Sequence, residues 1–225
     1  MHKSKTLLAG CLLSTSILTA TNCWADNDMN SYKISVTNLN PGQPLAPIMA
    51  SSHRAGIAFF TAGDAPSAEL AMLAEAGNGN PMAEKLLAMP GVTDAQVSTS
   101  GLTFPGKTTT LIVKAKRGRD VVSIGSMLGA TNDAFFAVSN VALPKKGRAV
   151  TYEANVYDAG SETNDELSST VAGLGGEGYS PDDSGEGFVH IHNGIHGIGN
   201  LVPAIHGWNN PAAKIVIERM KKDRH

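Results

Sequence analysis

Alternation of apolar and polar residues recurs in short runs along most of the chain. Such period-two runs are typical of strands with one buried face, because successive side chains point to opposite sides of a sheet. Gly, Pro, Asn and Asp separate the runs, as expected where turns join antiparallel strands. The predicted strands cover residues 32–36, 108–115, 121–127, 134–143, 149–157, 188–192 and 214–220. We therefore expect an all-β fold, an antiparallel β-sandwich.

One interval, residues 67–89, lacks this alternation. Residues 69–76 are rich in helix-forming side chains with apolar positions at helical spacing, and Gly77 follows as a stop signal. A second helical piece covers residues 81–88 and begins with proline, which favours the first turn of a helix. We expect a short helical insertion between early strands and not a separate domain.

The first 25 residues have the pattern of a secretory signal peptide. Lys3 and Lys5 supply a basic start, an apolar run covers residues 6–20, and Ala25 is a small residue at a suitable cleavage point. The apolar run is too short and too rich in Ser and Thr to span a bilayer. The sequence predicts a secreted or periplasmic protein, cleaved near Ala25, without a transmembrane segment.

An alternative is lipoprotein anchoring. Residues 8–11 (LAGC) resemble the lipobox of bacterial lipoproteins, which would be acylated at Cys11. Few apolar residues precede Cys11 and the apolar run continues beyond it, so ordinary cleavage after Ala25 is favoured. That cleavage removes both Cys11 and Cys23, so stability has to come from core burial or from a metal.

The remaining chain is predicted to have three parts. Residues 26–31 are expected to be a short disordered N-terminus, residues 32–220 the β-sandwich domain, and residues 221–225 a charged tail. Loss of Lys3 and Lys5 with the signal changes the formal net charge from −2 to −4. A mildly acidic domain is a poor candidate for binding nucleic acid.

Three carboxylates lie next to predicted strands. Asp158 and Glu162 follow the strand at residues 149–157, and Asp133 lies in the loop that leads into the strand at residues 134–143. Carboxylates on loops at one end of a β-structure suit a hard cation such as Ca²⁺, which takes oxygen ligands in irregular geometry. Asp and Gly are also common in plain turns for backbone reasons. Spacing alone leaves both interpretations open.

Three segments in matching order resemble the spondin amino-terminal domain family. The first comprises residues 44–53, 60–63 and 66–77, the second residues 126–127 with 132–138, and the third residues 157–162. The resemblance spans about residues 32–220. It implies a β-sandwich with C2-like topology that binds one calcium ion through acidic loop residues. Animal members of the family are secreted matrix and adhesion proteins.

The resemblance places the calcium ligands at Asp133, Asp158 and Glu162, and it favours an ion over a plain turn. The third ligand is Asp in the family pattern, and the longer Glu here would move the ion or change its denticity. Further oxygens could come from nearby Asn132, Asn164 and Asp165. The implied function is a non-catalytic recognition or attachment module with a polysaccharide, a protein or a lipid surface as partner. This chain lacks the cysteines and thrombospondin-type repeats of the animal proteins.

Four histidines near the C-terminus suggest an alternative. His190 and His192 would share one face of a strand at residues 188–192, and His196 and His206 follow. A His-x-His pair with a further His is a common way to bind Zn²⁺, Cu²⁺ or Ni²⁺. Histidines also pack or donate to backbone carbonyls, and the sequence favours that structural role. A histidine-site metal-dependent hydrolase, or another metalloenzyme of the cell envelope, is the alternative function.

Overall fold

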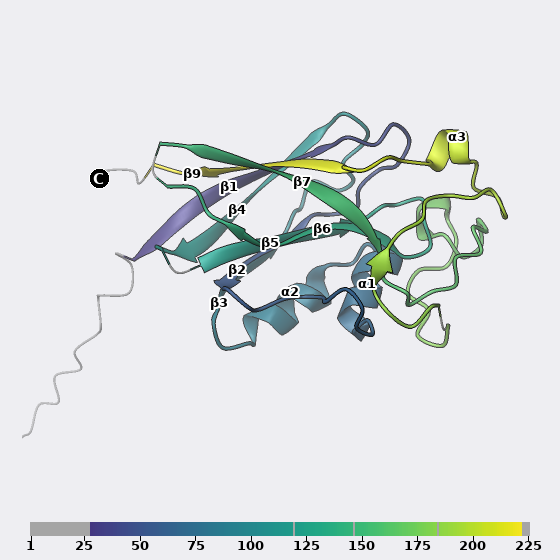
Figure 1. Ribbon diagram of the computed structural model, residues 1–225, viewed down its shortest axis with the longest axis horizontal. Coiled ribbons are helices and arrows are strands. Elements are labelled where there is room, and N and C mark those ends of the chain that lie inside the picture. The colour runs from purple at the N-terminus through teal and green to yellow at the C-terminus, as the bar shows by residue number, and fades with distance from the viewer. Residues whose placement is uncertain (1–27, 119, 146, 184, 222–225) are drawn as a thin grey trace, which may run out of the picture.

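The computed structural model describes residues 28–118, 120–145, 147–183 and 185–221 (Figure 1). The predicted signal peptide, with the lipobox and both cysteines, lies outside the described residues, as does most of the predicted tail. The strands are β1 (Met29–Asn38), β2 (Met49–Arg54), β3 (Val92–Val97), β4 (Thr108–Lys116), β5 (Asp120–Met127), β6 (Ala134–Ala142), β7 (Ala149–Asp158), β8 (His190–Ile191) and β9 (Ala213–Arg219). All pairings among them are antiparallel, which confirms the predicted all-β class.

The strands form a sheet that folds over on itself into two layers. The order is β3-β2-β5-β6-β7-β9-β1-β4, with β8 paired to β7. β7 joins the layers, because its first part pairs with β9 and its last four residues pair with β6. The two edge strands approach each other, and the backbone N–H of Lys114 in β4 donates to Asp94 Oδ2 in β3 at 2.7 Å. The described strands therefore form a nearly closed sandwich.

Two apolar clusters lie on opposite faces of the β2–β5–β6 layer. The main core fills the sandwich interior and includes Ile34, Val113, Ile124, Phe136, Val156 and Ile217. The second lies between the outer face and the helices and includes Met49, Leu70, Leu73, Met82, Leu86 and Phe135. Neighbouring residues of β6 thus serve different cores, because successive side chains of a strand point to opposite faces. Burial on both faces fixes the register of this layer.

Helices α1 (Ala68–Ala76) and α2 (Asn80–Leu87) cover the outer face of this layer and confirm the predicted helical insertion (Figure 1). The Ser67 hydroxyl caps α1 by accepting the Leu70 N–H at 3.3 Å. Gly77 ends α1 at a φ of 66°. A 3₁₀ turn (Ala172–Leu174) and α3 (Pro203–His206) lie in the later loops. The longest helix in the described part of the chain has nine residues, and none there could cross a membrane.

The observed strands differ from the predicted ones where burial or loop geometry overrides the pattern. β2 was missed because it is buried on both faces and carries polar residues, so it shows no alternation. β3, an edge strand with a polar sequence, was also missed. The strand predicted at residues 188–192 shortens to His190–Ile191. β1 begins at Met29 and so includes residues expected to belong to a disordered N-terminus.

Replacement of Phe136 tests the packing of the main core. Phe136 is fully buried in it, so Phe136→Ala should lower the free energy of unfolding by about 3–5 kcal/mol. Phe104 is 59% exposed, and Phe104→Ala should change it by less than about 0.5 kcal/mol. Urea denaturation of both variants measures the difference. Equal losses would contradict the assignment of Phe136 to the core.

Candidate metal centre

The three predicted calcium ligands gather where β6 begins and β7 ends. Ala134 pairs with Asp158, so Asp133 lies beside Asp158 at the same end of the sheet. Glu162 follows four residues after Asp158 in the next loop. All three side chains are buried, with exposures of 1% or less. Strand pairing therefore explains how acids 25 residues apart in sequence meet.

The Asp133 carboxylate organises the loop that contains Glu162. Its Oδ2 accepts the backbone N–H of Ser161 at 2.8 Å and that of Glu162 at 3.1 Å. Asp133 Oδ1 and Glu162 Oε2 are also buried, but neither accepts a hydrogen bond from any described residue. Buried polar atoms nearly always have a partner. These two oxygens are therefore the atoms of the cluster best placed to bind a cation.

Burial and mutual repulsion favour the protonated forms of these acids. Burial raises the pKa of Asp133 well above its usual range, and the neighbouring Asp158 carboxylate raises it further. Burial likewise raises the pKa of Glu162 to about 8, with a contribution from the negative charge of Glu75, while a hydrogen bond from Asn132 opposes the shift. Without a cation, Glu162 therefore favours its protonated form at neutral pH, and the raised pKa of Asp133 disfavours its ionised form.

Asn132 and Glu166 fasten the remaining loops. Asn132 Nδ2 lies 3.1 Å from Asp165 Oδ1 and 3.4 Å from Glu162 Oε1, and its Oδ1 accepts the Glu166 N–H at 3.2 Å. Glu166 is itself buried. Its carboxylate accepts the backbone N–H groups of His196, Gly197 and Ile198. Buried polar side chains thus replace strand pairing in this part of the chain.

Two of the four predicted histidines face Asp158. His190 Nε2 lies 3.8 Å from Asp158 Oδ1, and His192 Nε2 lies 3.6 Å from Asp158 Oδ2. Burial lowers the pKa of His192, although the Asp158 carboxylate opposes that shift. A cavity of about 190 Å³ is lined by Asp158, His190 and His192, and His196 lines it too. His206 lies on α3, where its Nδ1 accepts the Val202 N–H at 2.9 Å.

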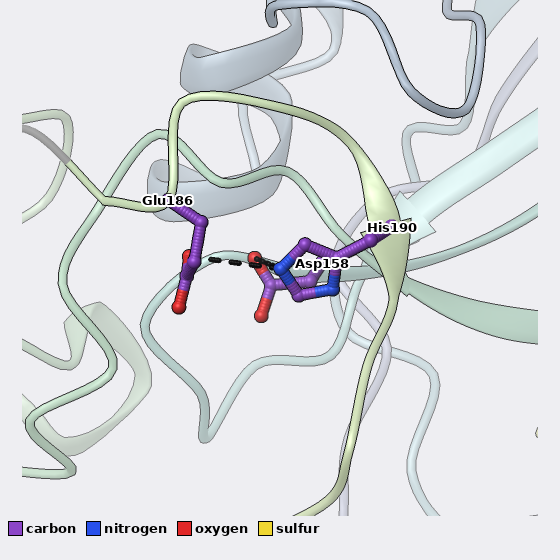
Figure 2. A group of neighbouring side chains, drawn as sticks. All are labelled: Asp158, Glu186 and His190. Atoms are coloured by element: carbon purple, nitrogen blue, oxygen red, sulfur yellow. Dashed lines mark ion pairs between the residues drawn. The ribbon is translucent and has the colours of Figure 1, made fainter.

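A mixed group in the lining of this cavity could hold a metal ion. Ligand atoms of Asp158, Glu186 and His190 all lie within 4.8 Å of one another (Figure 2). His190 Nε2 is 3.7 Å from Glu186 Oε2. Among the described residues, no other set of three His, Cys, Asp or Glu side chains has its ligand atoms this close together. The acids predicted around Asp158 and the four histidines do not form such a group by themselves.

Glu186 was missed in the sequence and joins the site through a close loop contact. It stands four residues before His190 in a segment without regular structure, so neither strand nor helix periodicity indicates its direction. Gly160, at a φ of 67°, lets the loop after β7 pack directly against the backbone of Phe188. The Gly187 N–H donates to the Gly160 carbonyl at 2.8 Å. This contact holds the Glu186 and His190 segment over Asp158.

A comparison with protein-family models gives no match, and neither does a comparison with curated protein sequences. The spondin-type assignment therefore stays a prediction from the three sequence segments.

Replacement of Gly160 tests whether that loop contact positions the site. A Cβ atom at Gly160 would lie 2.3 Å from the Phe188 carbonyl oxygen, so Gly160→Ala must displace one of the two loops. Gly187 provides a matched control, since its φ is 80° but nothing lies within 4 Å of a Cβ there. In each variant, alanine in a left-handed backbone conformation should lower the free energy of unfolding by about 1 kcal/mol.

Gly160→Ala should also shift the NMR signals of His190, and Gly187→Ala should shift them much less. Heteronuclear spectra and urea denaturation of both variants provide the measurement. Equal spectral changes in the two variants would contradict the positioning role of Gly160.

Proposed function

We propose that this protein is an exported, calcium-binding β-sandwich module that serves recognition or attachment and not catalysis. The observation that carries the proposal is the pair of buried oxygens, Asp133 Oδ1 and Glu162 Oε2, which lack hydrogen-bond donors among the described residues. Both belong to side chains grouped with Asp158 at one end of the sandwich. The ligand atoms of the three acids do not all lie within 4.8 Å of one another, so the loops would have to close on a cation for it to bind both oxygens and neutralise part of the charge.

The chemistry of the donor set fits a hard cation. Ca²⁺ binds six to eight oxygens and accepts carboxylates together with amide and backbone carbonyls and water. Asp133, Asp158 and Glu162 supply carboxylates, while the Asn132 amide N–H group donates to Glu162 Oε1 and so holds that carboxylate in place. Three buried carboxylates repel one another unless protons or a cation neutralise them. Calcium would therefore replace protons that the raised pKa values otherwise favour.

The loop region beside the cluster supports a role in recognition. Residues 159–183 and 185–212 contain little regular structure and lie together at one end of the sandwich (Figure 1). Large apolar side chains are exposed there: Leu167, Leu174, Phe188, Ile191, Ile198, Val202 and Ile205. Exposed apolar side chains grouped near one site are typical of binding surfaces. A bound cation would order the loops that present them.

Two further parts of the proposal rest on the sequence. Export follows from the signal-peptide pattern of the first 25 residues. A calcium-dependent adhesive role follows from the resemblance to the spondin amino-terminal domain family. The partner is expected to be a polysaccharide, a protein or a lipid surface of the cell envelope or the extracellular space.

Calcium should stabilise the protein against heat. A ligand present at 100 times its Kd adds about 2.7 kcal/mol to the free energy of unfolding, which raises Tm by about 5–10 °C in a domain of this size. Asp158→Ala, Asp133→Asn and Glu162→Gln should each remove most of the rise. Asp182→Asn is the control, because Asp182 is an exposed acid outside the cluster. Differential scanning calorimetry with millimolar Ca²⁺ or EDTA provides the measurement. An unchanged Tm of the wild-type protein would refute the proposal.

The stability of the calcium-free protein should fall as the pH rises. Glu162 has a pKa of about 8 in the folded protein against 4.5 when unperturbed, so between these values the folded state holds a proton that the unfolded state has lost. The free energy of unfolding therefore decreases from about pH 4.5 to about pH 8. Glu162→Gln should reduce this slope, and the remaining slope should reflect the raised pKa of Asp133.

Urea denaturation in EDTA across this pH range measures the effect. Saturating Ca²⁺ should weaken the pH dependence, because the cation favours the ionised carboxylates. A slope that Glu162→Gln leaves unchanged would contradict the assigned role of Glu162.

A further inference from the structure

We infer that Asp158, Glu186 and His190 form a second metal site, specific for a borderline dication such as Zn²⁺. The site lies beside the proposed calcium position and shares Asp158 with it. Its other two side chains are absent from the proposed calcium ligands, so the two proposals can fail independently. The assignment rests on the direction of the His190 lone pair, the hydrogen bonds that orient both carboxylates, and the spacing of the three ligand atoms.

The hydrogen bond of His190 leaves Nε2 free to bind a metal. Its Nδ1 lies 3.1 Å from the Ile191 carbonyl oxygen, and a carbonyl can only accept a hydrogen bond. Nδ1 therefore carries the proton in the neutral ring, and Nε2 holds the lone pair. That nitrogen faces Asp158 Oδ1 at 3.8 Å and Glu186 Oε2 at 3.7 Å. Asp158 Oδ1 also accepts the Gly160 N–H at 2.8 Å, which leaves it a second lone pair. Three electron-pair donors thus face one another, and a cation between them could bind all three.

His192 has the opposite arrangement. Its Nδ1 accepts the backbone N–H of Gly194 at 2.9 Å, so Nδ1 holds the lone pair in the neutral ring and Nε2 carries the proton. The buried Nε2 thus presents an N–H group toward Asp158 Oδ2 at 3.6 Å. A neutral His192 in this arrangement cannot ligate a metal through Nε2. The His-x-His pair therefore contributes one ligand and not two.

Asn164 orients both carboxylates of the site. Its Nδ2 donates to Asp158 Oδ2 at 2.8 Å and lies 3.4 Å from Glu186 Oε1. The other oxygen of each carboxylate is the one that faces His190. Hydrogen bonds to the outer oxygens are a common way to fix metal-binding carboxylates. The Asn164 amide thus turns one oxygen of Asp158 and one oxygen of Glu186 toward His190 Nε2.

The two spacings from His190 fit a tetrahedral ion after a small contraction, and the Asp158 and Glu186 oxygens lie within 4.8 Å of each other. Zinc bonds of about 2.0–2.1 Å give ligand atoms about 3.3–3.4 Å apart in a tetrahedron. The His190 distances of 3.7 and 3.8 Å exceed this by about 0.3–0.5 Å. Glu186 lies in a loop and its side chain is 41% exposed, so it can close on an ion. The adjoining cavity of about 190 Å³ leaves room for water at the fourth position.

The ligand set selects against calcium at this second position. Calcium binds oxygen donors, whereas imidazole nitrogen suits zinc, copper and nickel. A site with one imidazole and two carboxylates should therefore prefer Zn²⁺ over Ca²⁺. Millimolar Ca²⁺ should leave at least part of the zinc binding intact, because neither Glu186 nor His190 is needed for calcium.

Isothermal titration with Zn²⁺, using protein purified without a polyhistidine tag, tests the assignment. The wild-type protein should bind one Zn²⁺, and His190→Gln or Glu186→Gln should each weaken binding at least about tenfold. Asn164→Ala should weaken it by about 10–100-fold because it releases both carboxylates. His206→Gln is the matched control and should retain wild-type affinity. Equal zinc affinity in wild type and His190→Gln would overturn the inference.

The calcium shift in Tm separates this inference from the proposed function. His190→Gln and Glu186→Gln should keep the calcium-induced rise, whereas Asp133→Asn and Glu162→Gln should keep zinc binding and lose that rise. Retained calcium stabilisation also shows that the first two variants are folded. Loss of zinc binding in Asp133→Asn or Glu162→Gln, with His190→Gln unaffected, would move the zinc to the other cluster and refute the assigned ligands.

NMR of the ¹⁵N-histidine-labelled wild-type protein tests the tautomers without any substitution. Long-range ¹H–¹⁵N spectra should show a proton on Nδ1 of His190 and on Nε2 of His192. Addition of Zn²⁺ should shift His190 Nε2 far more than either ring nitrogen of His206. A proton on Nε2 of His190 before zinc is added, or a zinc-induced shift confined to other histidines, would overturn the inference.

Discussion

The turn before β6 holds together the part of the molecule that lacks strand pairing. Asp133 accepts two backbone N–H groups of the loop after β7, and Asn132 bonds to both Asp165 and the backbone of Glu166. Glu166 then binds three N–H groups of the loop at residues 196–198. Buried backbone groups need hydrogen-bond partners, and here the side chains of Asn132, Asp133 and Glu166 supply them. Two adjacent residues thus support loops that come much later in the chain.

This arrangement has an electrostatic cost that would make the loops sensitive to ions if the proposed sites bind them. The Asp133 carboxylate accepts backbone N–H groups through Oδ2. Its Oδ1 is buried away from water without a hydrogen-bond partner among the described residues. Proton binding or cation binding offsets that cost in different ways. A proton neutralises one carboxylate at a time, whereas a dication can bind several. On the proposed function, the same contacts that order the loops would couple their order to pH and to metal concentration.

β7 links this region to the sandwich. Its first part lies in one layer beside β9, and its last residues lie in the other beside β6. Asp158 is the final residue of the strand and is buried at the point where the loops begin. Metal binding at Asp158 would consequently stabilise the end of β7, a strand that belongs to both layers. This connection explains how ion binding at one end could stabilise the whole domain.

The sequence predicted those features that depend on local pattern and strand order. Alternation located seven strands, and acids at adjacent strand ends indicated that Asp133 and Asp158 would meet. β2 could not be found by alternation, because helices α1 and α2 cover its outer face and both faces are buried. Glu186 could not be placed because its position depends on the close contact of Gly160 with Phe188. Pattern predicts elements well, but loop contacts between distant residues require the folded structure.

The roles of the two histidines illustrate a limit of a different kind. His190 and His192 are equivalent in a sequence motif, yet one donates through Nδ1 to a carbonyl and the other accepts through Nδ1 from an amide. These neighbours decide which ring nitrogen holds the lone pair toward Asp158.

The charge of the acidic cluster links the two proposed ions. Asp133, Asp158, Glu162 and Glu186 carry four negative charges when ionised, and one dication would neutralise only half of them. A second dication at His190 would neutralise the rest, and its nitrogen ligand distinguishes it from the first.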